Sequence, residues 1–185
     1  MIDRGQLAQP MAGEGCRAEP FAEQYRQLLK AACAEDDEIW AIYWMSFAPG
    51  HFDDSIDRLC ANPANSVFVL FATNSQGGEE FAGMSSFLGI DDGRQVVEIG
   101  ATYYRPKFRG TGFNRSVKDM MLHRAFGCGV RRVEFRVDIR NGRSQAAVKK
   151  LGAVREGVLR GDRITWTGHV RDTVLFAILK HEWPV

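Results

Sequence analysis

Residues 105–114 read RPKFRGTGFN, and this stretch decides the fold because a strand pattern ends before it and a helix pattern follows it. Gly110 and Gly112 lie between the alternating run that ends at Tyr104 and the helix-period run that begins near Phe113. A turn of this kind leaves backbone N–H groups free at the positive end of a helix dipole, which suits a phosphate or pyrophosphate. Taken alone, the two glycines fit a tight strand-to-helix loop equally well.

The bulk composition is that of an ordinary globular protein. The 185 residues are 45% hydrophobic and 25% charged, which suits one domain. We expect a flexible segment over residues 1–12 and a single domain over residues 13–185. The longest apolar runs fall well short of the ~20 residues that span a bilayer, and the N-terminus does not read as a signal peptide. The four Cys and four His are scattered, so we expect a cytoplasmic protein with free thiols, no metal and no membrane partner.

Charge is divided unevenly along the chain. Residues 1–104 carry 6 Lys or Arg against 16 Asp or Glu, a net charge of −10, whereas residues 105–163 carry 16 against 5, a net charge of +11. A small polyanionic ligand is enough to explain the basic half, so we predict no nucleic-acid partner, although such a pattern leaves nucleic-acid binding open. The acidic half suits either a cationic acceptor or a solvated surface.

Hydrophobic spacing predicts a mixed α/β (α+β) protein. Helical periods cover residues 21–34, 37–44, 53–60, 112–126 and 143–151. Strand patterns cover residues 16–19, 67–71, 81–90, 95–104, 132–138, 154–164 and 170–179. We expect a mixed central sheet with an antiparallel N-terminal meander, flanking helices and a C-terminal β-hairpin.

Three motifs in this order resemble the GNAT N-acetyltransferase superfamily. They are PKFRGTGFN opening a helix, VDIRNGRS, and KKLGAVREGVLR, and the ending RDTVLFAILKHEWP is similar to the ribosomal-protein N-acetyltransferase (RimJ/RimL-like) branch. The resemblance is strong over residues 98–184 and weaker over residues 17–97. It implies the GNAT fold, acetyl-coenzyme A (acetyl-CoA) as donor and a primary amine as acceptor.

The resemblance also implies where acetyl-CoA binds. The family motif Q/R-x-x-G-x-G/A falls on Lys107, Gly110 and Gly112, with lysine in the first position. Backbone groups near residues 101–103 are expected to pair with the pantetheine arm. The full predicted set is Ala101, Thr102, Tyr103, Lys107, Phe108, Arg109, Gly110, Thr111, Gly112, Phe113, Asn114, Asn141 and Ser144.

The resemblance implies that the Ser144 hydroxyl protonates or stabilises the departing thiolate, and that Asn141 contacts the cofactor arm. Many relatives use a tyrosine later in this helix, but Val148 stands at that position. A helix cap is the alternative role for Asn141 and Ser144, because Asn or Ser before a helical run satisfies free N–H groups.

Direct attack of an amine on a thioester needs a base and accurate positioning. Glu98 is the first candidate for the base, Glu156 and Asp162 are weaker ones, and an ordered water is the remaining alternative. The acid that some relatives carry after the second helix is replaced here by Arg163. A backbone N–H around Thr102 or Tyr103 would stabilise the negative charge that develops on the thioester oxygen.

The acceptor is less well determined by the sequence than the donor. Trp40 and Trp44 form an aromatic cluster that suits either the core or the lip of an acceptor pocket. The predicted function is N-acetyl transfer to a protein N-terminal α-amine or to a small amine or aminoacyl compound. A non-catalytic coenzyme A (CoA) binding module is the alternative, and the chain is expected to be a monomer or a homodimer.

Overall fold

The computed structural model describes residues 1–74 and 76–184. Between the strand patterns at residues 67–71 and 81–90 the sequence predicts a turn at residues 74–78. This turn and the predicted domain end at residue 185 each include a residue outside the described range.

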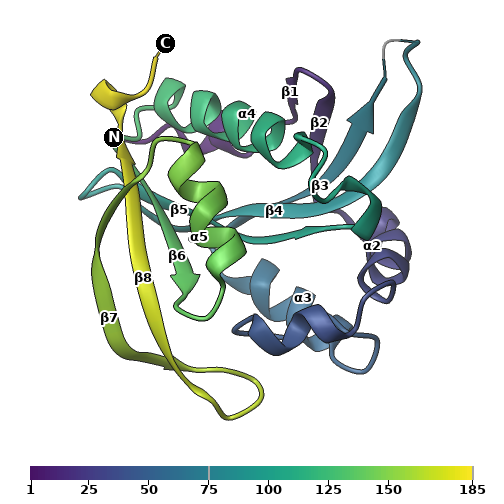
Figure 1. Ribbon diagram of the computed structural model, residues 1–185. Helices are drawn as coiled ribbons and strands as arrows, with labels where there is room; N and C mark the ends of the chain where they lie inside the picture. The colour runs from purple at the N-terminus through teal and green to yellow at the C-terminus, as the bar shows by residue number, and fades with distance from the viewer. Residues whose placement is uncertain (75, 185) are drawn as a thin grey trace.

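Across the described residues, eight strands form one sheet in the order β1-β2-β3-β4-β5-β6-β8-β7 (Figure 1). The strands are β1 (Met11–Gly13), β2 (Cys16–Pro20), β3 (Ser66–Thr73), β4 (Glu79–Asp91), β5 (Val96–Tyr104), β6 (Arg132–Asp138), β7 (Val154–Ile164) and β8 (Val170–Leu179). The α-helices are α1 (Arg4–Leu7), α2 (Arg26–Cys33), α3 (Phe52–Ala61), α4 (Phe113–Gly127) and α5 (Gly142–Lys150). Short 3₁₀ turns are η1 (Glu23–Tyr25), η2 (Glu38–Ile42), η3 (Pro106–Phe108) and η4 (Lys180–Glu182).

Helices cover both faces of the sheet. One core cluster lies beneath α4 and α5, and a second lies beneath α2, η2 and α3 on the opposite face (Figure 1). An extra residue in β5 between Gly100 and Tyr103 explains how one strand serves both clusters. Val97 and Ile99 join the first cluster, whereas Ala101 and Tyr103, which strict alternation would place on the same face, join the second. The predicted mixed sheet, meander and C-terminal hairpin are confirmed.

The sheet opens between β5 and β6, the one parallel neighbouring pair in the part of the chain that the structure describes. Their pairing runs only from Val96, opposite Arg132, to Glu98, opposite Glu134. Beyond that point β5 stays paired with β4 and β6 stays paired with β8. The facing edges of residues 99–104 and 135–138 therefore separate, and this opening positions the site.

The first dozen residues depart from the expectation of a flexible segment. They form α1 and β1, and Ile2, Leu7 and Met11 are buried in the first core cluster. β1 pairs with β2, and the Asp3 N–H donates to the carbonyl of Cys128 at 2.9 Å. Burial of apolar side chains outweighs the loose composition of this segment.

Two predicted helices are also shorter than expected. Where the sequence predicts a helix over residues 21–34, the structure has η1 followed by α2. Where it predicts a helix over residues 37–44, the structure has the five-residue η2. Trp40 explains the second difference, because its Nε1 donates to the carbonyl of Cys33 at 3.2 Å and packing fixes the segment locally.

Candidate active site

The turn before α4 has the geometry of an anion site. Gly110 and Gly112 adopt φ of 79° and 90°, left-handed values that side chains with a Cβ rarely take, and Gly112 is the N-cap of α4. The N–H groups of Gly110, Thr111, Gly112 and Asn114 donate to no described residue. The N–H of Arg109 donates to the carbonyl of Pro106, and that of Phe113 donates to Thr111 Oγ1 at 3.4 Å. Four free N–H groups at a helix N-terminus fit a phosphate or pyrophosphate.

The basic side chains around this turn are largely engaged by the acidic half of the chain. Arg105 Nε donates to Glu35 at 2.7 Å, and Lys107 forms an ion pair with Glu80. The Arg109 side chain turns back, with Nε donating to the Tyr104 carbonyl at 2.8 Å and Nη1 pairing with Asp36. Lys107 and Arg109 therefore lie at the turn as predicted, but their charges are partly neutralised within the chain. Phe108 and Phe113 pack against each other, with ring centroids 5.2 Å apart.

A bulge in β5 faces the opening between β5 and β6. β4 advances from Met84 to Ser86 while β5 uses one residue more, from Gly100 to Tyr103. Ala101 takes up the extra length with φ of 45°, which is strained for a residue with a Cβ. Tyr43 Oη holds the bulge by donating to the carbonyl of Thr102 at 2.6 Å.

Asn141 caps α5, as one of the two sequence interpretations predicts. Its Oδ1 accepts a hydrogen bond from the N–H of Ser144 at 2.9 Å, and both side chains are half-buried. The loop before the cap is ordered by Asp138, whose Oδ1 accepts from the Arg140 N–H at 2.9 Å and whose carbonyl accepts from the Asn141 N–H at 2.8 Å. The cap leaves the Asn141 amide group and the Ser144 hydroxyl available to a ligand, since neither donates to a described residue.

Glu98 lies on the opposite face of β5, with its carboxylate directed along the strand toward the bulge. A Cβ placed on Gly100 would lie 2.6 Å from Glu98 Oε1, so glycine is required there to admit the carboxylate. Among the described residues Glu98 accepts no hydrogen bond, and its nearest cation is Arg136 Nε at 3.8 Å. Burial raises the pKa of Glu98 to about 7, although Arg163, Arg136 and Arg171 act to lower it.

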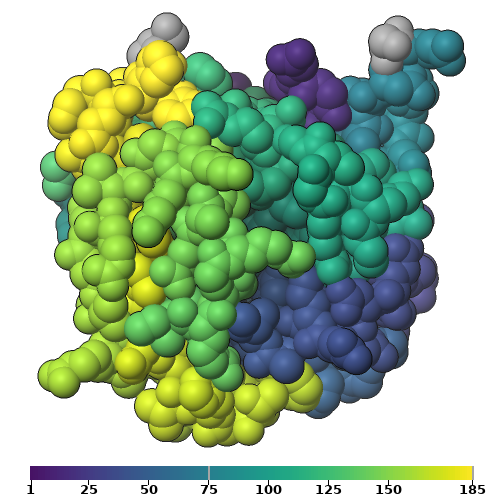
Figure 2. All heavy atoms as spheres, viewed as in Figure 1, coloured from purple at the N-terminus to yellow at the C-terminus, as the bar shows by residue number. Residues whose placement is uncertain are grey.

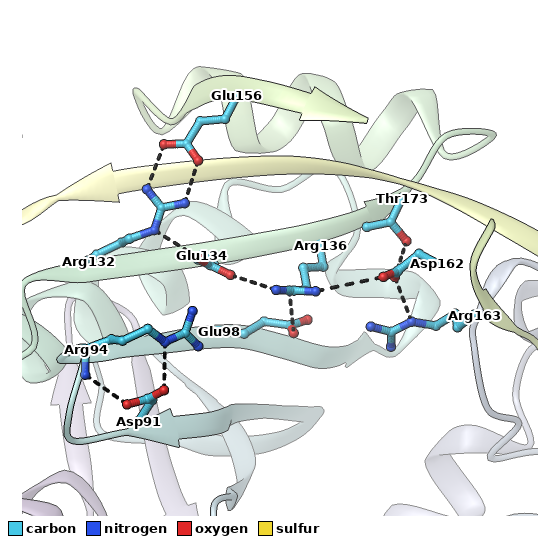
Figure 3. A network of polar contacts seen from close by, with 10 residues as sticks. All are labelled: Asp91, Arg94, Glu98, Arg132, Glu134, Arg136, Glu156, Asp162, Arg163 and Thr173. Atoms are coloured by element: carbon cyan, nitrogen blue, oxygen red, sulfur yellow. Dashed lines mark hydrogen bonds and ion pairs between the residues drawn. The ribbon is translucent and has the colours of Figure 1, made fainter. Parts of the chain in front are cut away.

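Figure 3 shows the polar network in which Glu98 lies. Arg136 extends from β6 toward Glu98, and its Nη1 is 4.0 Å from Asp162 of β7. Arg163 Nε donates to Asp162 at 3.1 Å. Glu98, Arg136 and Arg163 line a cavity of about 180 Å³ together with Leu88, Gly89, Arg94, Val96 and Glu134.

The carboxylates of the two weaker base candidates, Glu156 and Asp162, accept hydrogen bonds from arginine or threonine side chains. Glu156 accepts from Arg132 Nη1 at 2.7 Å, and this hydrogen bond lowers the pKa of its carboxyl. Burial acts to raise the pKa of Asp162, but hydrogen bonds from Thr173 and Arg163 bring it below its usual value. Both are weaker proton acceptors near neutral pH than Glu98.

The two predicted acceptor tryptophans lie in different environments. Trp40 is 0% exposed and stacks on Tyr103 with ring centroids 4.9 Å apart, so it belongs to the core and not to a pocket lip. Trp44 is half-buried, and the Arg163 guanidinium lies 5.6 Å from its ring centroid. Trp166, which the sequence analysis did not single out, connects the β7–β8 hairpin to the segment that carries Trp40 and Trp44. Its Nε1 donates to the Trp40 carbonyl at 2.8 Å.

Several residues of the site were missed or misplaced by sequence reasoning. Gly100, Tyr43 and Asp138 act only through the folded arrangement, and their neighbours in sequence give no specific signal. The position of Lys118 shortly after the glycine turn predicts that it adds positive charge there, but its side chain is 5% exposed on the buried face of α4. Its position four residues before Leu122, which is also buried, could have indicated the buried face of the helix.

Three segments that carry predicted site residues adjoin one another on one face of the molecule (Figure 2). In Figure 2 the region of α5, drawn in green, the start of α4, drawn in teal, and the purple-blue segment near residues 35–50 adjoin one another there. Within residues 1–74 and 76–184, the structure contains no group of three or more His, Cys, Asp or Glu side chains that could hold a metal ion. None of the described helices is both long and apolar enough to cross a membrane.

Comparison with known proteins identifies the family. Residues 18–154 match the model of the acetyltransferase (GNAT) domain. A solved structure from T. thermophilus, assigned as an acetyltransferase, is 32% identical with a TM-score of 0.83, covering 95% of this chain and 92% of its own. One assigned to the GNAT family, from Chromobacterium violaceum, is 26% identical with a TM-score of 0.86, covering 95% of this chain and 88% of its own. Curated proteins gave no match.

A third solved structure, Mycobacterium smegmatis RimJ in complex with CoA-disulfide, shares the fold. It is 20% identical with a TM-score of 0.78, covering 95% of this chain and 88% of its own. The chain belongs to the GNAT acetyltransferases, and it is an acetyl-CoA-dependent N-acetyltransferase. The narrower RimJ/RimL-like branch stays a prediction.

Proposed function

We propose that this enzyme acetylates a primary amine by direct attack on bound acetyl-CoA, with Glu98 as the general base. The observation that carries the proposal is the placement of the Glu98 carboxylate over Gly100, directed toward the bulge at Ala101 where β5 and β6 separate. A base must lie within reach of the proton that it removes, and its pKa works best near the operating pH. Glu98 meets the second condition because burial raises its pKa to about 7.

The residues of the α4 face fit the CoA portion of the donor. The free N–H groups at residues 110–112 and 114 suit a pyrophosphate, and the unpaired edge of β5 offers backbone groups to the amides of a pantetheine arm. Asn141 is placed to donate its amide group to the same arm. RimJ, which has this fold, was solved with a CoA disulfide, which supports the assignment.

In the proposed reaction the amine nitrogen bonds to the thioester carbonyl carbon while the carbon–sulfur bond breaks. Glu98 takes the proton from the attacking nitrogen. The Ser144 hydroxyl donates a hydrogen bond that stabilises the departing thiolate, which then takes a proton from solvent. The bulge at Ala101 and Thr102 holds the β5 backbone beside the carbonyl group, where an N–H stabilises the developing negative charge. Glu98 and the bulge lie on β5, and Ser144 lies on α5 after β6, so the proposed groups come from both sides of the opening.

The acceptor side favours a small primary amine or a single N-terminal residue. Glu98 and Arg163 line a cavity of about 180 Å³, and the Trp44 ring lies next to the Arg163 guanidinium. A buried carboxylate positioned for proton transfer also disfavours a non-catalytic CoA-binding module, since such a module has no need of it.

Two measurements test this proposal. Acetyl-CoA and CoA should each raise the melting temperature and compete for one site, and no shift at saturating ligand would contradict the donor assignment. Free-thiol release should then be measured with a panel of small amines, aminoacyl compounds and peptides. Turnover of the small amines with no peptide acetylation, or the reverse, separates the two acceptor classes, and no turnover with any of them would contradict the proposed function.

A further inference from the structure

Lys118 is a buried lysine that the reaction described above does not use. It extends from α4 onto the sheet, where Nζ donates to Thr102 Oγ1 at 2.7 Å and to Ser85 Oγ at 3.3 Å. The two hydroxyls also bond each other at 2.7 Å. Among the described residues these neutral hydroxyls are its hydrogen-bond partners, and no carboxylate lies within ion-pair distance.

Keeping this lysine in the interior costs stability. Burial lowers the pKa of Lys118 to about 7, although the charge of Glu98 acts to raise it. Because the ordinary value is 10.5, the unfolded chain binds more protons than the folded chain between about pH 7 and 10.5. At neutral pH the lysine therefore weakens folding, and an apolar residue of the same length would stabilise the protein.

The location of Lys118 indicates a role that could offset this loss of stability. Ser85 lies on β4 and Thr102 on β5, and Thr102 directly follows the strained Ala101. The lysine thus ties α4 to both strands at the bulge, on the face opposite to Glu98. Thr102 is held at two points, at its hydroxyl by Lys118 and at its carbonyl by Tyr43.

We propose that Lys118 is a positioning residue for acetyl transfer: by holding the Thr102 side chain from beneath α4, it keeps the β5 bulge in the conformation that faces the thioester. The role rests on the proposed acetyl-CoA site. Lys118 acts through Thr102 and does not touch the reacting atoms. A displacement of about 1 Å at such a point is enough to lower turnover strongly while leaving the remote contacts of the ligand intact.

The test compares K118M, T102V and the double variant K118M/T102V with the wild type, with K180M as a control. Lys180 is exposed in η4, outside the proposed site. Methionine keeps the length of Lys118 and removes its donors, and valine keeps the shape of Thr102 and removes its hydroxyl. The measurements are melting temperature at pH 7, CoA affinity by calorimetry, and kcat and KM with the best acceptor of the amine panel.

We expect K118M to melt about 2–4 °C above the wild type, because an unpaired buried amine is removed. Its kcat should fall about tenfold while CoA affinity and KM stay within about twofold. T102V should lose a similar factor in kcat, and the double variant should lose little more than either single variant, because both changes remove one interaction. K180M should match the wild type.

Three results would overturn the role of Lys118 while leaving the CoA site in place: an unchanged kcat in K118M, multiplied losses in the double variant, or a lower melting temperature that accounts for the lost activity. A lower melting temperature of this kind would show that Lys118 has only a structural role. Failure of the wild-type protein to bind CoA would instead overturn the proposed site, and this role with it.

Discussion

The two faces of the sheet at the β5 bulge are built from different kinds of group. On the α4 face the site is mainly backbone, with the left-handed turn at Gly110 and Gly112 and the cap of α5 at Asn141. On the opposite face it is made of charged side chains from separate strands, among them Glu98 and Arg136. Backbone geometry follows short stretches of sequence, so the donor side can be recognised locally, whereas the acceptor side exists only after the strands are brought together.

The folded structure changes the interpretation of the uneven charge along the chain. The basic residues near the turn form ion pairs with the acidic first half, as Arg105 does with Glu35 and Lys107 with Glu80. The opposite charge excesses of the two parts of the chain are therefore partly neutralised within the molecule. We therefore expect anion binding at this turn to depend on the free N–H groups more than on the surrounding lysines and arginines.

The largest expected effect is on the acceptor face. E98Q should lower kcat about 100-fold, because removing a general base costs roughly 10²- to 10⁴-fold, and CoA affinity should be unchanged. Calorimetry with CoA and thiol-release kinetics measure the two quantities. E156Q, which loses an exposed ion pair with Arg132, is the matched control. Equal kcat in E98Q and E156Q would leave water as the base.

The pH dependence of kcat/KM tests the assignment of Glu98 as the general base. The value of kcat/KM should rise through an apparent pKa of about 7, the value to which burial raises Glu98, and fall about tenfold per pH unit below it. An aromatic amine acceptor, which is neutral throughout this range, keeps its own ionisation out of the profile. A limb near pH 7 that persists in E98Q would assign the titration to another group.

The pH dependence of protein stability tests the raised pKa of Glu98 independently of catalysis. Its folded pKa of about 7 lies above the ordinary 4.5, so the folded chain binds more protons between these values, and stability falls as pH rises through this window. The melting temperature of E98Q relative to the wild type should therefore be higher at about pH 8 than at about pH 5. The same difference at both pH values would contradict the raised pKa.

A smaller effect is expected on the donor face. G112A should weaken CoA binding about tenfold and lower the melting temperature by about 2–4 °C, because alanine is strained at φ of 90°. G127A is the control in the same helix, since Gly127 is the exposed last residue of α4 with open space around its Cα. Equal CoA affinity in the two variants would show that the turn does not hold the ligand.

The smallest effect should come from Ser144. S144A should lower kcat about fivefold and leave CoA affinity unchanged, because a thiolate is a good leaving group that needs limited help from an acid. N141A should instead lower both the melting temperature and CoA affinity, because a cap contributes about 1 kcal/mol. An equal loss of kcat and CoA affinity in S144A would make Ser144 a binding residue only.

Much of the fold could be predicted from the sequence, and the errors have identifiable causes. The strands from residues 66 to 104 and the α4 turn follow from alternation and from two glycines, both of which are local. The N-terminal segment was expected to be loose because Gly13 and Gly15 follow it closely, yet Ile2, Leu7 and Met11 find apolar partners under α4. Such partners are distant in sequence, so no local pattern reports them.

The site divides in the same way. The sequence by itself was enough to predict the anion turn, the α5 cap and Glu98 as the first candidate base, because each prediction rests on a few neighbouring residues. Only the tertiary structure decided that Trp40 is core, that Gly100 admits the Glu98 carboxylate and that Lys118 lies beneath the bulge. These facts depend on which strands and helices become neighbours, and burial and pKa are properties of those neighbours rather than of the residue itself.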